Sequence, residues 1–163
     1  MKTIIIYAST YGYARECGKQ LAEEIQGDVV LVDIATDRVP KLDDFDNIVI
    51  GCSIHMGQVQ KKIKTFCTAN LDLLTGKNTS LFICCGSPEN MDQTLKNNLP
   101  GELLEKAKNI ECFGGEIVKE RLNFPHKVLI GIMEKSAAQD GRAPMRKMPE
   151  NISKLSAAIN KSE

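Results

Sequence analysis

The chain has 163 residues, of which 42% are hydrophobic, so it is long enough for one domain with a complete core. Its 21 basic and 21 acidic side chains balance, and this neutrality argues against nucleic acid as a partner. No apolar run reaches the roughly 20 residues of a membrane helix, and no secretory pattern precedes the first strand-like run, so we expect a cytoplasmic protein without a membrane span.

The first predicted element is a strand over residues 3–8, which are apolar or β-branched and carry no charge. A helical pattern begins at Ala14, and between the two lies a turn rich in hydroxyl groups. Backbone N–H groups and the positive end of the helix dipole converge in such a turn, which therefore predicts a phosphate site. The candidate phosphate contacts are Ser9, Thr10, Tyr11, Gly12, Tyr13 and Ala14.

Gly12 allows a close approach of the ligand or a positive φ. The turn has no Lys and fits neither the Walker pattern nor the three-glycine dinucleotide pattern, which favours a small phosphomonoester. The alternative is that Ser9 or Thr10 serves only as the helix N-cap.

Further along the chain, apolar runs predict strands, and residues with helical spacing predict helices. The strands are expected at residues 29–34, 46–51, 79–85 and about 109–118. Helices are expected at residues 14–26, at 58–74, on both sides of a break at 99–101, at 126–138, and from Pro149 onward. Strands that alternate with helices predict a parallel sheet covered on both faces. We expect one domain over residues 1–163.

The turn after the first strand resembles the phosphate loop of flavodoxins, which usually ends in Thr or Ser where this chain has Ala14. The resemblance implies an α/β fold, a flavodoxin-like three-layer sandwich with a five-stranded parallel sheet in the order 2-1-3-4-5. It also implies noncovalent FMN as the cofactor, electron transfer as the function, and a reductase or ferredoxin-type redox partner. An electron carrier needs no catalytic side chain, and none is assigned.

Two later loops would border the flavin ring in this resemblance. Their candidate contacts are Ser53, Ile54, His55, Met56 and Gly57 after the third strand, and Gly86, Ser87 and Pro88 after the fourth. Met56-Gly57 resembles a pair of short flavodoxins in which a backbone carbonyl turns over and accepts a hydrogen bond from N5 of the one-electron-reduced flavin. The alternatives are that Met56-Gly57 shapes a helix start and that Pro88 only forms a turn.

An extra helix and loop at about residues 122–147 separate the fifth strand from the last helix. With the loop that contains Met56-Gly57, they resemble the menaquinone-dependent protoporphyrinogen oxidase branch of the flavodoxin superfamily, which implies a small-molecule porphyrinogen or quinone substrate. Nine basic residues face five acidic ones from Lys119 to Glu163. This excess leaves open a carboxylate-bearing substrate, an acidic partner or peripheral membrane contact, and the alternative is a solvated loop with a surface helix that packs on the sheet.

Six cysteines lie mostly within apolar stretches and form no Cys-x-x-Cys pair, as is typical of reduced core residues. They are Cys17, Cys52, Cys67, Cys84, Cys85 and Cys112. The adjacent Cys84 and Cys85 should point to opposite faces of their strand, which argues against a redox pair between them. Neither His55 nor His126 stands at ligand spacing from a Cys, so no metal site is expected.

Overall fold

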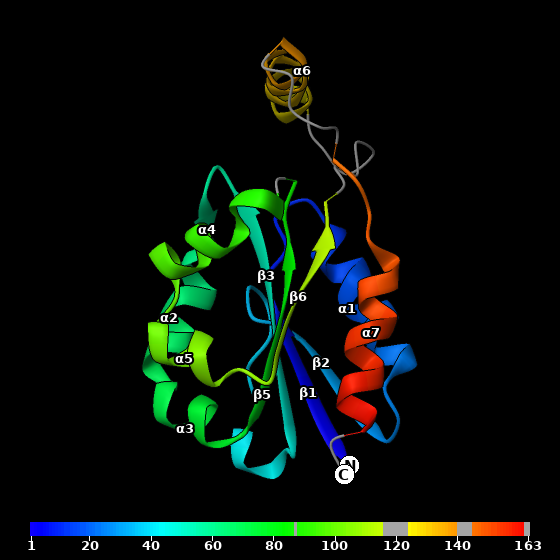
Figure 1. The fold of residues 1–163 in the computed structure, drawn as a ribbon, viewed down its shortest axis with the longest axis vertical. Helices are drawn as coiled ribbons and strands as arrows, with labels where there is room; N and C mark the ends of the chain where they lie inside the picture. The colour runs from blue at the N-terminus through cyan, green and yellow to red at the C-terminus, as the bar shows by residue number, and fades with distance from the viewer. Residues whose placement is uncertain (87, 116–123, 140–144, 162–163) are drawn as a thin grey trace.

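The computed structural model describes residues 1–86, 88–115, 124–139 and 145–161. Five parallel strands form its sheet in the order β2-β1-β3-β5-β6 (Figure 1). Their bounds are β1 Lys2–Tyr7, β2 Asp28–Asp33, β3 Asn47–His55, β5 Asn78–Cys84 and β6 Asn109–Gly114. The short strand β4, Gln58–Val59, pairs antiparallel with the end of β3. Without this hairpin arm, the order is the expected 2-1-3-4-5, which is confirmed.

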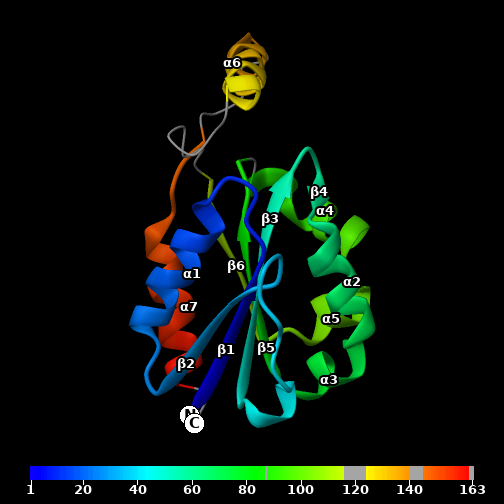
Figure 2. The ribbon, with the colours of Figure 1, turned by 180° about the vertical axis from the view of Figure 1, so that it is seen from behind.

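Helices cover both faces of the sheet, so the predicted three layers are also confirmed (Figures 1 and 2). One face carries α1, Tyr13–Glu24, and α7, Pro149–Asn160. The other carries α2 Lys61–Ala69, α3 Leu71–Gly76, α4 Met91–Asn98 and α5 Gly101–Lys106. Short 3-10 turns, η1 and η2, lie at Leu42–Asp44 and Pro88–Asn90.

The core consists of two apolar clusters, one on each face of the sheet. Alternate residues of β1 supply both: Ile4 and Ile6 pack under α2 to α5, whereas Ile5 and Tyr7 pack under α1 and α7. Because the strands are buried on both sides, their sequences are apolar almost throughout, as is usual for parallel sheets.

Gly51 lies where the ring of Phe82 crosses β3. A Cβ atom at Gly51 would overlap Cζ of Phe82 and come within 2.8 Å of Tyr7 Cβ. Phe82 is itself stacked on Phe113, with ring centroids 4.8 Å apart, so its ring has no room to retreat. Gly51→Ala is therefore expected to lower the free energy of unfolding in urea by about 1–3 kcal/mol.

Gly76 provides the matched control for this substitution, because no atom lies within 4 Å of a Cβ built there. Gly76→Ala should leave the unfolding free energy unchanged or raise it slightly. Equal stability of the two variants would contradict the steric argument at Gly51.

Three predicted boundaries are wrong. The helix expected over residues 58–74 begins only at Lys61, because Gln58–Val59 form β4. It is also divided into α2 and α3 at Asn70, whose side-chain amide donates to the Phe66 carbonyl at 2.9 Å. An Asn side chain that bonds to nearby backbone competes with helix continuation. The loop expected from Cys52 starts too early, since β3 continues to His55 where β4 pairs with it.

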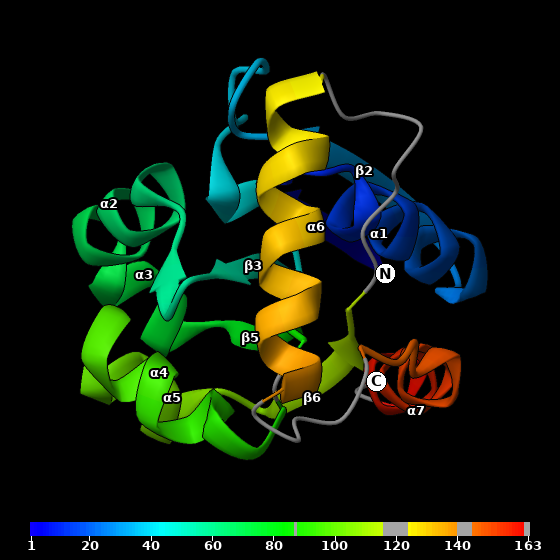
Figure 3. The same ribbon diagram turned by 90° about the horizontal axis from the view of Figure 1, so that it is seen from above.

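The predicted extra helix is present as α6, Phe124–Gln139, and it lies beyond the carboxyl ends of the strands (Figures 1 and 3). The interpretation that it packs on a face of the sheet is wrong: Phe124 is 80% exposed, Val128 49% and Ile132 61%. The loop expected at residues 140–144 and the end of the fifth strand, 116–118, lie outside the described residues.

After the inserted segment, the chain runs beside the end of β6 at residues 146–148. Gly114 forms an antiparallel bridge with Lys147, the Gly115 N–H donates to the Arg146 carbonyl at 3.1 Å, and the Met148 N–H donates to the Phe113 carbonyl at 3.1 Å. These bonds join the two ends of the inserted segment and let α7 begin at Pro149, as predicted. Within the described ranges, no helix combines the length and apolar character needed to cross a bilayer.

Candidate functional site

The fold brings the three predicted loops to one edge of the sheet. The turn after β1, the hairpin that ends β3 and the segment after β5 all follow the carboxyl ends of adjacent parallel strands (Figures 2 and 3). Gly86 and Pro88 are half-buried there, whereas Ser87 lies outside the described residues. In a sheet of this type, the carboxyl edge at the point where the strand order reverses is the usual ligand site.

The turn before α1 ends in Gly12, which has a φ of 93° and occupies the N-cap position without any side-chain capping bond. Ser9 does not cap the helix: its Oγ accepts from the Gly12 N–H at 3.0 Å, within the turn. The alternative that Ser9 or Thr10 serves only as the N-cap is therefore wrong. A helix start without a side-chain cap offers its first N–H groups and its dipole to an anion.

The other predicted members of the turn have separate surroundings. Ala14 is buried in the core at 1% exposed, so only its backbone could contact a ligand. Tyr13 donates its hydroxyl to the Phe113 carbonyl at 2.8 Å, which ties the start of α1 to β6. Tyr11 meets His55 edge to face, with ring centroids 5.4 Å apart. A residue predicted for the phosphate and one predicted for the ring are thus in contact.

Arg15 lies in the first turn of α1, but its charge is engaged. Its guanidinium forms an ion pair with Asp33 at 2.9 Å, and the Asp33 side chain is only 8% exposed. The Asp33 hydrogen bond is the main cause that raises the pKa of Arg15, and burial raises the pKa of the neighbouring Tyr7. Negative charge in the turn would therefore be met mainly by N–H groups, hydroxyls and the helix dipole.

Gln60 connects the turn to β3, and sequence reasoning missed it because the residue fell inside a predicted helix. Its side-chain amide donates to the Ala8 carbonyl at 3.2 Å and to Thr10 Oγ1 at 3.5 Å, while its oxygen accepts from the Ser53 N–H at 3.0 Å. One side chain thus holds two of the predicted loops together.

Replacing Gln60 with Leu should remove these bonds and leave the Ser53 N–H without its acceptor. We expect the unfolding free energy to fall by about 1–3 kcal/mol, the usual cost of an unsatisfied partly buried donor. The measurement is urea denaturation. Gln58→Leu is the matched control, because that exposed amide accepts from Lys64 at 3.1 Å on the surface, and its effect should stay within about 0.5 kcal/mol. Equal losses in the two variants would refute the connecting role.

Met56 and Gly57 form the turn of the β3–β4 hairpin. Their φ values are 50° and 72°, and His55 pairs with Gln58 across them. Two central residues with positive φ are the signature of a type I′ turn, which accounts for Gly57. The alternative that the pair shapes a helix start is wrong, because α2 begins only at Lys61.

Asn98 of α4 supports this hairpin. Its side-chain amide donates to the Gly57 carbonyl at 3.0 Å, and its oxygen accepts from the Val59 N–H at 3.2 Å. Met56 is 77% exposed beside this anchored carbonyl. Asn98 therefore holds the backbone of the hairpin tip, while the side chain of Met56 is exposed to solvent.

Met145, which returns from the inserted segment, covers the loop after β5. A Cβ built on Gly86 would lie 2.9 Å from Met145 Cγ. No spacing pattern could predict this contact, because the two residues belong to different segments far apart in the chain. The segment after α6 therefore borders the candidate ring loop.

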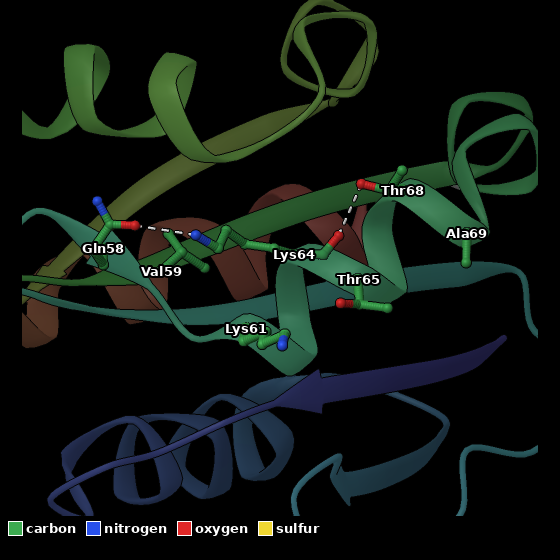
Figure 4. Close-up of a pocket in the computed structure, with 7 residues that line it drawn as sticks. All are labelled: Gln58, Val59, Lys61, Lys64, Thr65, Thr68 and Ala69. Atoms are coloured by element: carbon green, nitrogen blue, oxygen red, sulfur yellow. Dashed lines mark hydrogen bonds between the residues drawn. The ribbon is translucent and has the colours of Figure 1, made fainter.

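A groove of about 810 Å³ runs along α2 (Figure 4). In it, Lys64 donates to Gln58 Oε1 at 3.1 Å, and Thr68 donates to the Lys64 carbonyl at 3.0 Å. Its lining residues are Gln58, Val59, Lys61, Lys64, Thr65, Thr68 and Ala69. The groove begins next to the hairpin at Gln58, but none of the candidate site residues lines it.

The parallel sheet order and the uncapped glycine turn at its carboxyl edge define a flavodoxin-like α/β protein. A family model described as a flavodoxin domain matches residues 4–143, so the chain belongs to that family. No curated protein matches the chain in sequence.

Solved structures share this fold at low identity. Oxidised flavodoxin 1 of Bacillus cereus is 17% identical with a TM-score of 0.56, over 100% of this chain and 99% of that one. A short-chain flavodoxin associated with a non-canonical PDU bacterial microcompartment is 11% identical with a TM-score of 0.59, over 99% and 98%. Two-electron reduced Megasphaera elsdenii flavodoxin is 20% identical with a TM-score of 0.53, over 68% and 82%.

Proposed function

We propose that this protein binds FMN noncovalently at the carboxyl edge of its sheet and transfers electrons through it. The observation that carries the proposal is the start of α1, where Gly12 has a φ of 93° and no side chain caps the helix. Hydroxyls and backbone N–H groups suit a phosphomonoester at that place. Membership of the flavodoxin domain family supports the same function.

In this proposal, the turn of residues 9–14 binds the phosphate, and the hairpin and the loop after β5 border the ring. The hairpin residues are Ser53, Ile54, His55, Met56 and Gly57, and the loop residues are Gly86, Ser87 and Pro88. FMN supplies the redox chemistry, and the protein sets its potential and access. The residues of this chain would bind FMN, orient it and shield it from solvent, so no catalytic side chain is required.

A second candidate function is an FMN-dependent oxidoreductase of the protoporphyrinogen or quinone type. It is favoured by α6, which places the exposed side chains of Phe124, Val128 and Ile132 beyond the carboxyl edge. An apolar ring system could bind against such a surface. The carrier remains the first choice because family and fold both point to it.

The decisive experiment titrates purified protein with FMN and follows flavin fluorescence and the visible spectrum. We expect saturation at one FMN per chain, followed by electron exchange with a reductase or ferredoxin-type protein. Turnover of a porphyrinogen with a quinone acceptor would instead support the oxidoreductase. A folded protein that takes up no FMN would refute both functions.

We further propose that residues 1–163 form one domain and that the protein is cytoplasmic. Both apolar clusters pack on the same sheet, which supports one folding unit. None of the six cysteines, all of which lie in the described ranges, is in a disulfide, as expected in a reducing compartment.

A further inference from the structure

Two cysteines from neighbouring strands meet at the carboxyl edge of the sheet. Cys85 directly follows β5 and Cys112 belongs to β6, and their Sγ atoms lie 3.6 Å apart. Adjacent Cys84 contributes to the opposite face, where it bonds to Cys17 of α1. The pairing across strands was invisible in the sequence, which showed only the adjacent Cys84 and Cys85.

The two thiols of this pair differ in exposure, and the pKa of one of them is lowered. Hydrogen bonding from Cys85, with help from the Gly114 N–H at 3.4 Å, lowers the pKa of Cys112 to about 7, although burial opposes the shift. Cys112 is half-buried, whereas Cys85 is 5% exposed. Thiolate character and access make a cysteine reactive, so these features suit Cys112 as the attacking thiol and Cys85 as the second thiol.

We propose that Cys85 and Cys112 are a site of reversible oxidation, at which a hydroperoxide converts the two thiols into a disulfide between β5 and β6. The Cys112 thiolate attacks the peroxide, so that an S–O bond forms, the O–O bond breaks and an alkoxide or hydroxide leaves with a proton from water. The Cys85 sulfur then attacks Cys112, the S–S bond forms, and the hydroxyl leaves as water with the Cys85 proton. Two thiols and one hydroperoxide thus give one disulfide, one alcohol or water, and one water.

A bond between Cys85 and Cys112 is better supported than oxidation of the other cysteines. A disulfide needs sulfur atoms about 2.05 Å apart, so the two sulfur atoms must approach further than the present 3.6 Å. Cys112 stands opposite Ile83, two residues before Cys85, and the register between β5 and β6 shifts between Ile83 and Cys84, so the bond would join the two strands diagonally. Hydrogen bonding from Cys84 also lowers the pKa of Cys17, but Cys17 is 3% exposed and shielded from a peroxide. Burial raises the pKa of Cys67 to about 12, which makes it unreactive.

The test treats the purified full-length protein with hydrogen peroxide in the dark and digests it with trypsin after alkylation of remaining thiols. We expect a product in which the peptide of residues 78–96 is joined to that of residues 109–119, with two hydrogen atoms fewer than the separate peptides. Dithiothreitol should separate them. Cross-linked protein should also unfold at a higher urea concentration than the reduced form.

Cys84→Ala and Cys85→Ala are a matched pair, because the two side chains are adjacent and 4% and 5% exposed. Cys84→Ala should retain the cross-link and Cys85→Ala should lose it. Peptide 78–96 contains both Cys84 and Cys85. Fragment ions of the wild-type product therefore show which of these two sulfurs is linked to Cys112, even where a variant fails to fold. A link from residues 78–96 to the Cys17 peptide, or sulfinic acid at Cys112 without any link, would overturn the proposal, as would no oxidation of Cys112.

Discussion

Replacing Gly12 with Val is expected to weaken FMN binding roughly tenfold or more, on the proposed function. Gly12 has a φ of 93°, and a β-branched residue in the left-handed region costs about 1–2 kcal/mol. The turn can relieve this strain by moving, which displaces the N–H groups that would hold the phosphate. A loss of 1.4 kcal/mol corresponds to about a tenfold rise in Kd, which calorimetric titration with FMN would measure.

Gly12→Asn is the control, because Asn tolerates a positive φ better than other side chains. It should keep an affinity close to that of the wild type, provided that both variants show the wild-type far-ultraviolet circular dichroism. If the Val variant bound FMN as tightly as the Asn variant, the left-handed turn would have no part in holding the phosphate.

Replacing Gly57 with Val should narrow the gap between the two reduction potentials of bound FMN. Gly57 has a φ of 72° and no atom within 4 Å of a built Cβ, so the substitution acts on backbone conformation and not by collision. A change of about 60 mV in a reduction potential corresponds to a tenfold change in a one-electron equilibrium. We expect the gap between the two potentials to narrow by at least that amount. Spectroelectrochemistry measures both potentials.

Gly57→Asn keeps the positive φ accessible and should keep the wild-type gap. The Asn98 side chain, which bonds to the Gly57 carbonyl at 3.0 Å, remains in both variants, so the comparison isolates the turn. An identical gap in the Val variant, the Asn variant and the wild type would remove Gly57 from control of the potential.

The local pattern was sufficient to predict most of the strands and helices and the turn before the first helix. The uncharged run before Ser9 predicted a buried parallel strand. Gly12 at the following turn predicted either a close approach of the ligand or a positive φ, and its φ is 93°. Strand, turn and helix signals depend on neighbours within a few residues, so they are readable in the sequence. The strand order came from the resemblance, and the sheet confirms it.

Contacts between residues distant in the chain could not be read in this way. Gln60 bonds to Ala8, and Cys85 meets Cys112, because parallel strands place side by side residues that long crossovers separate in sequence. The position of α6 beyond the sheet edge could not be predicted either. A helical pattern of apolar residues shows that the helix has an apolar face, but it does not show what packs against that face. Local residue choice therefore accounts for which elements form and where the Gly12 turn lies, whereas the packed sheet accounts for which side chains meet at its carboxyl edge.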